Sequence, residues 1–192
     1  MTELNEDING SLAIFDIDDT MFRTTTRVHV VRNEKRIVSL TAAEFNVYKL
    51  NPSESFDFSE FRNAKHFADT AKPIANIFRL AKTILKRNAG RLIVVTARAD
   101  MDDKQLFIDT FRKYGFNMNK SHIFRAGNIN KPGAEAKKDI IRTQMTGQAY
   151  KTARMFDDAR KNLDAFKELA SEFPGCRFEA WLIHEDGSMV RY

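Results

Sequence analysis

Compact apolar runs alternate with longer amphipathic stretches along most of this chain of 192 residues. Each apolar run is bounded by polar or turn-forming residues, which is typical of short buried strands. The predicted strands cover residues 12–15, 92–95, 154–156 and 178–183, with a weaker fifth at 121–125. We therefore expect a sheet whose strands are separated by long connections.

The stretches between these strands have helical periodicity. Residues 73–88 place their apolar positions on one face, Pro73 suits the first turn, and Gly90 follows. Residues 102–114 and 160–172 repeat the pattern, with Gly115 and Pro174 after their ends. Strands that alternate with helices predict an α/β fold, a Rossmann-like parallel sheet with helices on both faces.

One region interrupts this alternation directly after the first strand. Its first part reads as a β-hairpin that turns near Asn33 and Glu34, and its second part as a short helix. Thr41 and Glu44 have the spacing of a capping box at the start of that helix. Because no Gly- or Pro-rich linker divides the chain, we expect one domain, 1–192, with a small insertion at about 21–72.

Composition fits a globular protein with one core, since 43% of the residues are apolar and 16 are Phe. The first ten residues are polar and acidic, which argues against a signal peptide, and no apolar run approaches a membrane span. We expect a soluble cytoplasmic protein without a membrane partner. The single cysteine, Cys176, excludes an internal disulfide and a thiolate zinc cluster, and the net charge of +5 permits an anionic ligand.

Reactive or metal-binding side chains follow three of the predicted strands. They are Asp16, Asp18 and Thr20 after the first, Thr96 and Arg98 after the second, and Asp157 and Asp158 after the third. The carboxyl ends of parallel strands meet at one edge of a sheet, where ligands bind in folds of this class. The coincidence of three such strand ends predicts a single site.

The acidic residues at these ends fit a hard divalent cation. Asp16 and Asp18 lie two apart on extended backbone and face the same side, and Asp157 adds oxygens from another strand. Grouped carboxylates cost free energy unless a positive charge lies among them, so we expect Mg²⁺, together with a lysine. A calcium loop is excluded because Met21 and Arg27 occupy the positions of its glycine and its bidentate glutamate. A solvated turn is the alternative for any one acidic stretch alone.

Four segments, "FDIDDT", "VVTAR", a lysine before the third strand and "FDDAR", occur in that order. They resemble the four motifs of the haloacid dehalogenase (HAD) superfamily of phosphohydrolases. The resemblance covers residues 12–158, and it implies that Asp16 is the nucleophile and that Asp18 is the general acid and base. Thr96 would bind a phosphate oxygen, and Asp157 would bind Mg²⁺ together with Asp16 and the backbone carbonyl of Asp18.

Further roles concern a lysine, Thr20, Arg98 and Asp158. Lys137 or Lys138 would neutralise the phosphoryl group, and Lys137 has the better spacing to the apolar residues that follow. Thr20 turns toward the same space, Arg98 either reaches substrate phosphate or caps its loop, and Asp158 supports the metal site beside Asp157. The residue before the motif threonine is commonly Gly in this family and is Asp19 here. The histidines lack the spacing of a metal cluster and read as surface or packing residues.

The insertion occupies the place of the cap that usually selects substrates in this superfamily. Between residues 21 and 50 it carries Arg23, Arg27, Arg32, Lys35, Arg36 and Lys49 against Glu34 and Glu44. Such a strip suits a polyanion, although ordinary solvated hairpin charge explains it equally well.

The motif arrangement is also similar to the 3′-phosphatase half of phage-type polynucleotide kinase-phosphatases, without their kinase half. The predicted substrate is therefore a phosphorylated nucleic-acid end or a nucleotide. A small-molecule phosphatase and a non-catalytic nucleic-acid-binding module are the alternatives. The sequence does not decide the oligomeric state.

Overall fold

The computed structural model describes residues 10–87 and 90–192. The polar N-terminal stretch and Asn88, the predicted end of the first long helix, lie outside the described residues.

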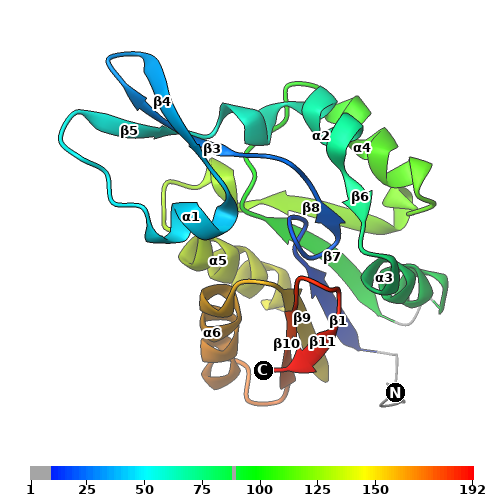
Figure 1. Cartoon of the computed structure of the whole chain (residues 1–192). Helices are drawn as coiled ribbons and strands as arrows, with labels where there is room; N and C mark the ends of the chain where they lie inside the picture. The colour runs from blue at the N-terminus through cyan, green and yellow to red at the C-terminus, as the bar shows by residue number, and fades with distance from the viewer. Residues whose placement is uncertain (1–9, 88–89) are drawn as a thin grey trace.

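A six-stranded sheet forms the centre of the structure (Figure 1). Its order is β11-β10-β9-β1-β7-β8. The strands are β1 (Ser11–Phe15), β7 (Arg91–Thr96), β8 (Ser121–Arg125), β9 (Thr152–Asp157), β10 (Arg177–Ile183) and β11 (Met189–Arg191). All pairings are parallel except that of β10 with the short edge strand β11. The five predicted strands and the predicted fold class are confirmed.

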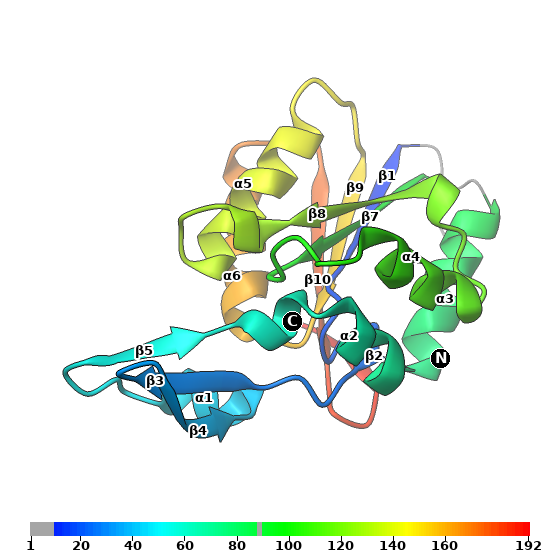
Figure 2. The ribbon, with the colours of Figure 1, turned by 90° about the horizontal axis from the view of Figure 1, so that it is seen from above.

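Helices cover both faces of this sheet, as Figure 2 shows from above. They are α3 (Ala75–Arg87) and α4 (Lys104–Lys113) on one face, and α5 (Gly133–Met145) and α6 (Arg160–Glu168) on the other. Successive side chains of β1 point to opposite faces of the sheet, so Phe15 packs with the first pair of helices and Ile14 with the second. Each face of the sheet therefore has its own apolar core.

The predicted helix boundaries need two corrections. Pro73 is not in the first turn of α3, because it pairs with Phe22 in a two-stranded ladder of β2 (Phe22–Arg23) and β6 (Lys72–Pro73). The last predicted helix ends its α-helical part at Glu168 and continues as the 3-10 helix η4 (Leu169–Ser171). Two further 3-10 helices are η2 (Met118–Lys120) and η3 (Ala126–Asn128).

The insertion between β2 and β6 contains its own antiparallel sheet, which extends away from the central sheet in Figures 1 and 2. Its elements are β3 (Val28–Arg32), β4 (Lys35–Leu40), α1 (Ala42–Val47), β5 (Glu54–Asp57), η1 (Ser59–Arg62) and α2 (Ala64–Thr70). The predicted hairpin is confirmed, with positive φ at both Asn33 and Glu34, as a two-residue turn requires. The capping box of Thr41 and Glu44 is confirmed as well. Strand β5 and helix α2 were not predicted.

Phe22 holds the start of the insertion against the central domain. Its ring contacts Phe67 of α2, Phe78 of α3 and Phe111 of α4, with ring centroids 4.9–5.3 Å apart. The side chain is fully buried. One aromatic residue, six positions after Asp16, therefore joins the acidic strand end to three helices.

No helix in the described part of the chain is long and apolar enough to cross a membrane.

The substitution Phe22→Ala should lower the free energy of unfolding by about 3–5 kcal/mol, because it leaves a cavity among three aromatic rings. Urea unfolding followed by circular dichroism measures this. Val47→Ala is the control, since Val47 is 77% exposed, and its effect should stay within about 0.5 kcal/mol. Equal effects of the two substitutions would contradict this account of the packing.

Candidate active site

The structure brings the three polar strand ends together at the carboxyl edge of the central sheet. Asp16 directly follows β1, while Thr96 ends β7 and Asp157 ends β9, and β1 lies between the other two strands. The backbone N–H of Asp16 donates to the carbonyl of Phe156 at 3.1 Å, which holds Asp16 beside Asp157. All three side chains are buried.

Lys137 lies between the two buried carboxylates. Its ammonium donates to Asp16 Oδ1 at 2.7 Å and to Asp157 Oδ2 at 2.8 Å, and the residue is 2% exposed. It reaches them from the second turn of α5. Of the two candidate lysines, Lys137 is therefore the one that lies among the strand-end carboxylates.

Lys138, the alternative lysine of the sequence analysis, is not part of this cluster. Its ammonium contacts Glu135 at 2.9 Å and Glu168 at 2.8 Å, between the outer sides of α5 and α6. Neighbouring residues on a helix point about 100° apart, so only one of the two lysines can face the strand ends.

The buried charges change the proton affinities of this cluster. Burial lowers the pKa of the Lys137 ammonium, but Asp157 and Asp16 more than offset this, so its pKa is raised and it stays charged. Burial raises the pKa of Asp16 well above its usual range; Lys137 opposes this rise, and the nearby carboxylates add to it. Without a further cation, the cluster is short of positive charge.

Asp157 is held from its other side by residues that begin α6. Its Oδ1 accepts the backbone N–H of Ala159 and the side-chain amide of Asn162, both at 2.9 Å. The sequence reasoning missed Asn162. Its position in the first turn after "FDDAR" was the available signal, because a side chain there points back toward the end of the preceding strand.

Asp158 completes a group of three carboxylates. Asp16, Asp157 and Asp158 each offer an oxygen, and these oxygens lie within 4.8 Å of one another. Burial, followed by the charge of Asp157, raises the pKa of Asp158 to about 7. Clustered carboxylate oxygens with raised pKa values fit a hard divalent cation, which would replace the protons. The Asp18 carboxylate does not belong to this group.

Asp18 instead faces Arg98. The guanidinium donates from Nε to Asp18 Oδ2 at 2.8 Å and from Nη2 to Oδ1 at 2.6 Å. Its other hydrogen bonds go to Thr26 Oγ1 and the carbonyl of Phe61 in the insertion, and it also lies over the rings of Phe61 and Phe67. Arg98 is 1% exposed and holds Asp18 and the insertion in place, while its expected contact with substrate stays a prediction.

The two threonines of the motifs differ in their surroundings. Thr96 is fully buried, and its hydroxyl accepts the backbone N–H of Arg98 at 3.1 Å. Thr20 donates to Asp158 Oδ1 at 3.4 Å, so it lies beside the carboxylate group. Between the motif carboxylates and Thr20, Asp19 has a φ of +55°, which explains why Gly suits this position and why Asp is tolerated.

The sheet order, the helices on both faces and the insertion after β1 define a fold class, which comparison with solved structures identifies as that of HAD domains. The HAD domain of effector protein Lem4 from Legionella pneumophila is similar, with a TM-score of 0.52 and 11% sequence identity. The match covers 88% of this chain and 84% of that one, and at this identity it shows the fold alone. No family model matches the sequence, and no curated protein matches it significantly.

Asp158→Asn should make the metal-free protein more stable at neutral and alkaline pH. The folded state binds the Asp158 proton more tightly than the unfolded state does, so stability falls as pH rises from about 4 to 7. The variant loses this fall, and its advantage over the wild type should grow with pH to about 1–3 kcal/mol at about pH 8.

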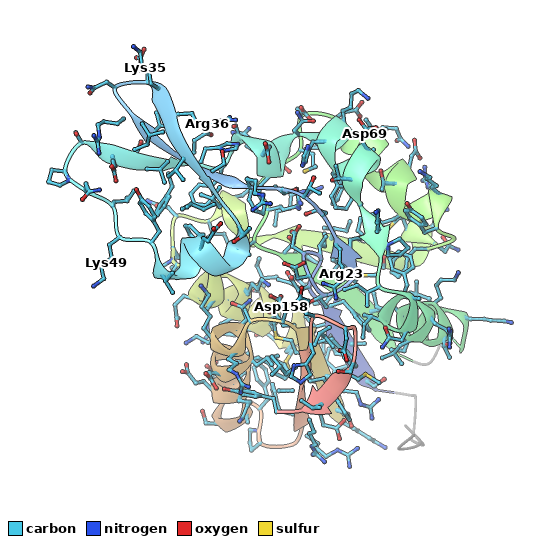
Figure 3. All side chains as sticks on the ribbon, in the orientation of Figure 1. Arg23, Lys35, Arg36, Lys49, Asp69 and Asp158 are labelled. Atoms are coloured by element: carbon cyan, nitrogen blue, oxygen red, sulfur yellow. The ribbon has the colours of Figure 1, made fainter. Side chains whose placement is uncertain are left out.

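Urea unfolding in EDTA at several pH values measures this difference. The control is Asp69→Asn on α2, where the exposed carboxylate lies far from the cluster (Figure 3). A pH-independent difference between Asp158→Asn and wild type would contradict the assignment.

Proposed function

We propose that this chain is a Mg²⁺-dependent phosphomonoesterase that forms a phosphoaspartyl intermediate at Asp16. The observation that carries this proposal is the bridge from Lys137 to Asp16 and Asp157, with Asp158 beside them. Phosphoryl transfer needs a positioned nucleophile and concentrated positive charge, and this cluster is arranged to supply both.

In the first step an Asp16 oxygen attacks phosphorus and the bond from phosphorus to the leaving oxygen breaks. Asp18 donates a proton to that oxygen, so the alcohol leaves neutral. In the second step Asp18 takes a proton from water, whose oxygen attacks the phosphoaspartate. Inorganic phosphate leaves, and the Asp16 carboxylate is restored.

The other residues hold charge and position during these steps. Lys137 keeps one Asp16 oxygen in place and offers positive charge to the phosphoryl oxygens. Asp16, Asp157 and Asp158 would hold Mg²⁺, which neutralises phosphoryl charge when bound. Thr96 lies at the end of β7, where its hydroxyl can donate to a phosphate oxygen while it accepts from Arg98.

A compact phosphorylated substrate, such as a nucleotide, has more support than a long polyanion. Half of the basic strip expected to follow nucleic acid lies within 4.0 Å of carboxylates, which weakens its positive field: Arg27 near Glu44, Arg32 beside Glu54 and Arg36 near Asp57. The acidic partners Glu54 and Asp57 lie just beyond the stretch of sequence that showed the basic excess. A nucleic-acid end stays within the proposal, and so does a small-molecule phosphate ester.

A non-catalytic binding module has less support, because the site holds several carboxylates close together, which is electrostatically unfavourable. Two buried carboxylates and the neighbouring Asp158 carboxylate share one lysine, and burial and mutual repulsion raise the pKa values of Asp16 and Asp158. A binding surface on the insertion gains nothing from that cost. We place the activity in the cytoplasm, because the single cysteine gives no sign of an oxidising compartment.

The wild-type protein should hydrolyse para-nitrophenyl phosphate with Mg²⁺ and lose this activity in EDTA. Asp16→Asn should lower kcat by about a thousandfold or more, because the nucleophile is gone. Lys138→Ala is the matched control and should stay within about twofold, since its ammonium pairs outside the cluster. Absence of hydrolysis by folded wild type with any divalent metal would overturn the proposal in favour of a binding module.

Arg98→Lys should lower kcat by about tenfold to a hundredfold while KM changes little. A lysine ammonium cannot reproduce the two parallel bonds to Asp18, so the acid loses its orientation without loss of ground-state binding. Steady-state kinetics across a pH range measure this, and the pH profile should change shape as well. A variant with unchanged kcat would show that the pair does not position Asp18.

A further inference from the structure

An open cavity of about 610 Å³ adjoins the carboxylate group. Its wall includes Asp158, which is also one of the three clustered carboxylates. The cavity therefore borders the carboxylate group on the side of Asp158. Its size suits the leaving group of a nucleotide-sized ester.

Side chains from both the central domain and the insertion surround this cavity. Arg23 comes from β2, Arg160 is the first residue of α6, His184 follows β10, and Thr41 belongs to the insertion. Figure 3 shows Arg23 and Asp158 near each other where the two parts meet, whereas Lys35 and Lys49 lie on the outer edges of the insertion.

The two arginines of this wall differ from most arginines of the molecule. Within the described ranges, neither Arg23 nor Arg160 has a carboxylate within 4.0 Å, while Arg27, Arg32 and Arg36 are all paired. Arg160 lies over the ring of Tyr192 at 5.3 Å, a contact that orients a guanidinium without neutralising it.

Acidic residues line the same cavity, so its wall is not uniformly positive. Asp19 and Glu185 are both present. The cations are therefore discrete contacts beside the reaction centre rather than a broad basic surface. Discrete guanidinium groups bind phosphate through paired N–H donors, which favours a compact anion at a fixed place.

We infer that Arg23 and Arg160 form a subsite for a second phosphate, carried by the leaving group of the substrate. This inference rests on the proposed function and narrows it to phosphomonoesters that bear another phosphate in the alcohol portion. A nucleoside bisphosphate and the last two nucleotides of a 3′-phosphorylated strand share this chemistry.

Paired substrates test the subsite. Adenosine 3′,5′-bisphosphate and a 3′-phosphorylated dinucleotide carry the second phosphate as a monoester and as a diester, and adenosine 3′-monophosphate lacks it. For wild type, kcat/KM should be about tenfold higher for at least one of the first two substrates than for adenosine 3′-monophosphate. The preferred substrate shows whether the second phosphate is bound as a monoester or as a diester. Equal values for all three would overturn the inference.

Two variants assign the preference to the arginines. Arg160→Ala and Arg23→Ala should each bring the ratio of kcat/KM values toward one, mainly through KM for the doubly phosphorylated substrate. Lys35→Ala, at the tip of the hairpin, is the control and should leave the ratio unchanged (Figure 3). An arginine variant that lowers kcat/KM equally for all substrates would show a structural role and contradict the subsite.

Binding to an inactive variant separates this inference from the proposed function. Asp16→Asn should still bind adenosine 3′,5′-bisphosphate in calorimetry, and adding Arg160→Ala should weaken that binding by about tenfold. If wild type hydrolyses no ester but this difference appears, the subsite stands and the proposed reaction fails. If hydrolysis occurs without the difference in binding, the reaction stands and the subsite fails.

Discussion

The ion pair of Lys137 with Asp16 and Asp157 is the interaction on which the site depends. It joins β1, β9 and α5 at one point, and each of its members is at least 95% buried. Removing Lys137 would leave two buried carboxylates without their cation, which costs several kcal/mol. The same ion pair therefore fixes the positions of the two strand ends and the charges of the three side chains.

The fold brings these residues together at one edge of the central sheet. Parallel strands deliver their carboxyl ends to one edge, and the order β9-β1-β7 puts Asp16 between the other two motifs. Phe22 then anchors the chain directly after the first motif, while Arg98 links Asp18 to the carbonyl of Phe61. The insertion is thus tied to the acid that would serve the leaving group, and the cavity with its two arginines lies beside it.

The sequence predicted the central sheet and the strand-end residues because both depend on local patterns. Buried parallel strands are short apolar runs, and the polar residues that end them stand out by contrast. Strand β5 was missed because "ESFD" alternates weakly, and α2 was missed because its apolar contacts come from α4 and Phe22, far away in the sequence.

The contacts of Arg98 and Lys138 could not be predicted from the sequence for a related reason. Ion-pair partners that are distant in the sequence cannot be identified from the sequence alone. In the structure Arg98 pairs with Asp18, and Lys138 pairs with Glu168. The basic strip likewise showed few acidic partners in the sequence, because Glu54 and Asp57 belong to strand β5, which comes after it.

The central claim is that the Asp16 carboxylate attacks phosphorus. Rapid quenching of the Asp18→Asn variant with para-nitrophenyl phosphate, followed by peptide mass spectrometry, tests this directly. The para-nitrophenolate leaves without a proton from Asp18, so loss of Asp18 should slow the second step more than the first and let the intermediate accumulate. The account predicts one added phosphoryl group on the peptide that contains Asp16, at Asp16 itself. A phosphoryl group on another residue, or phosphate release by this variant with no labelled protein at any time, would contradict it.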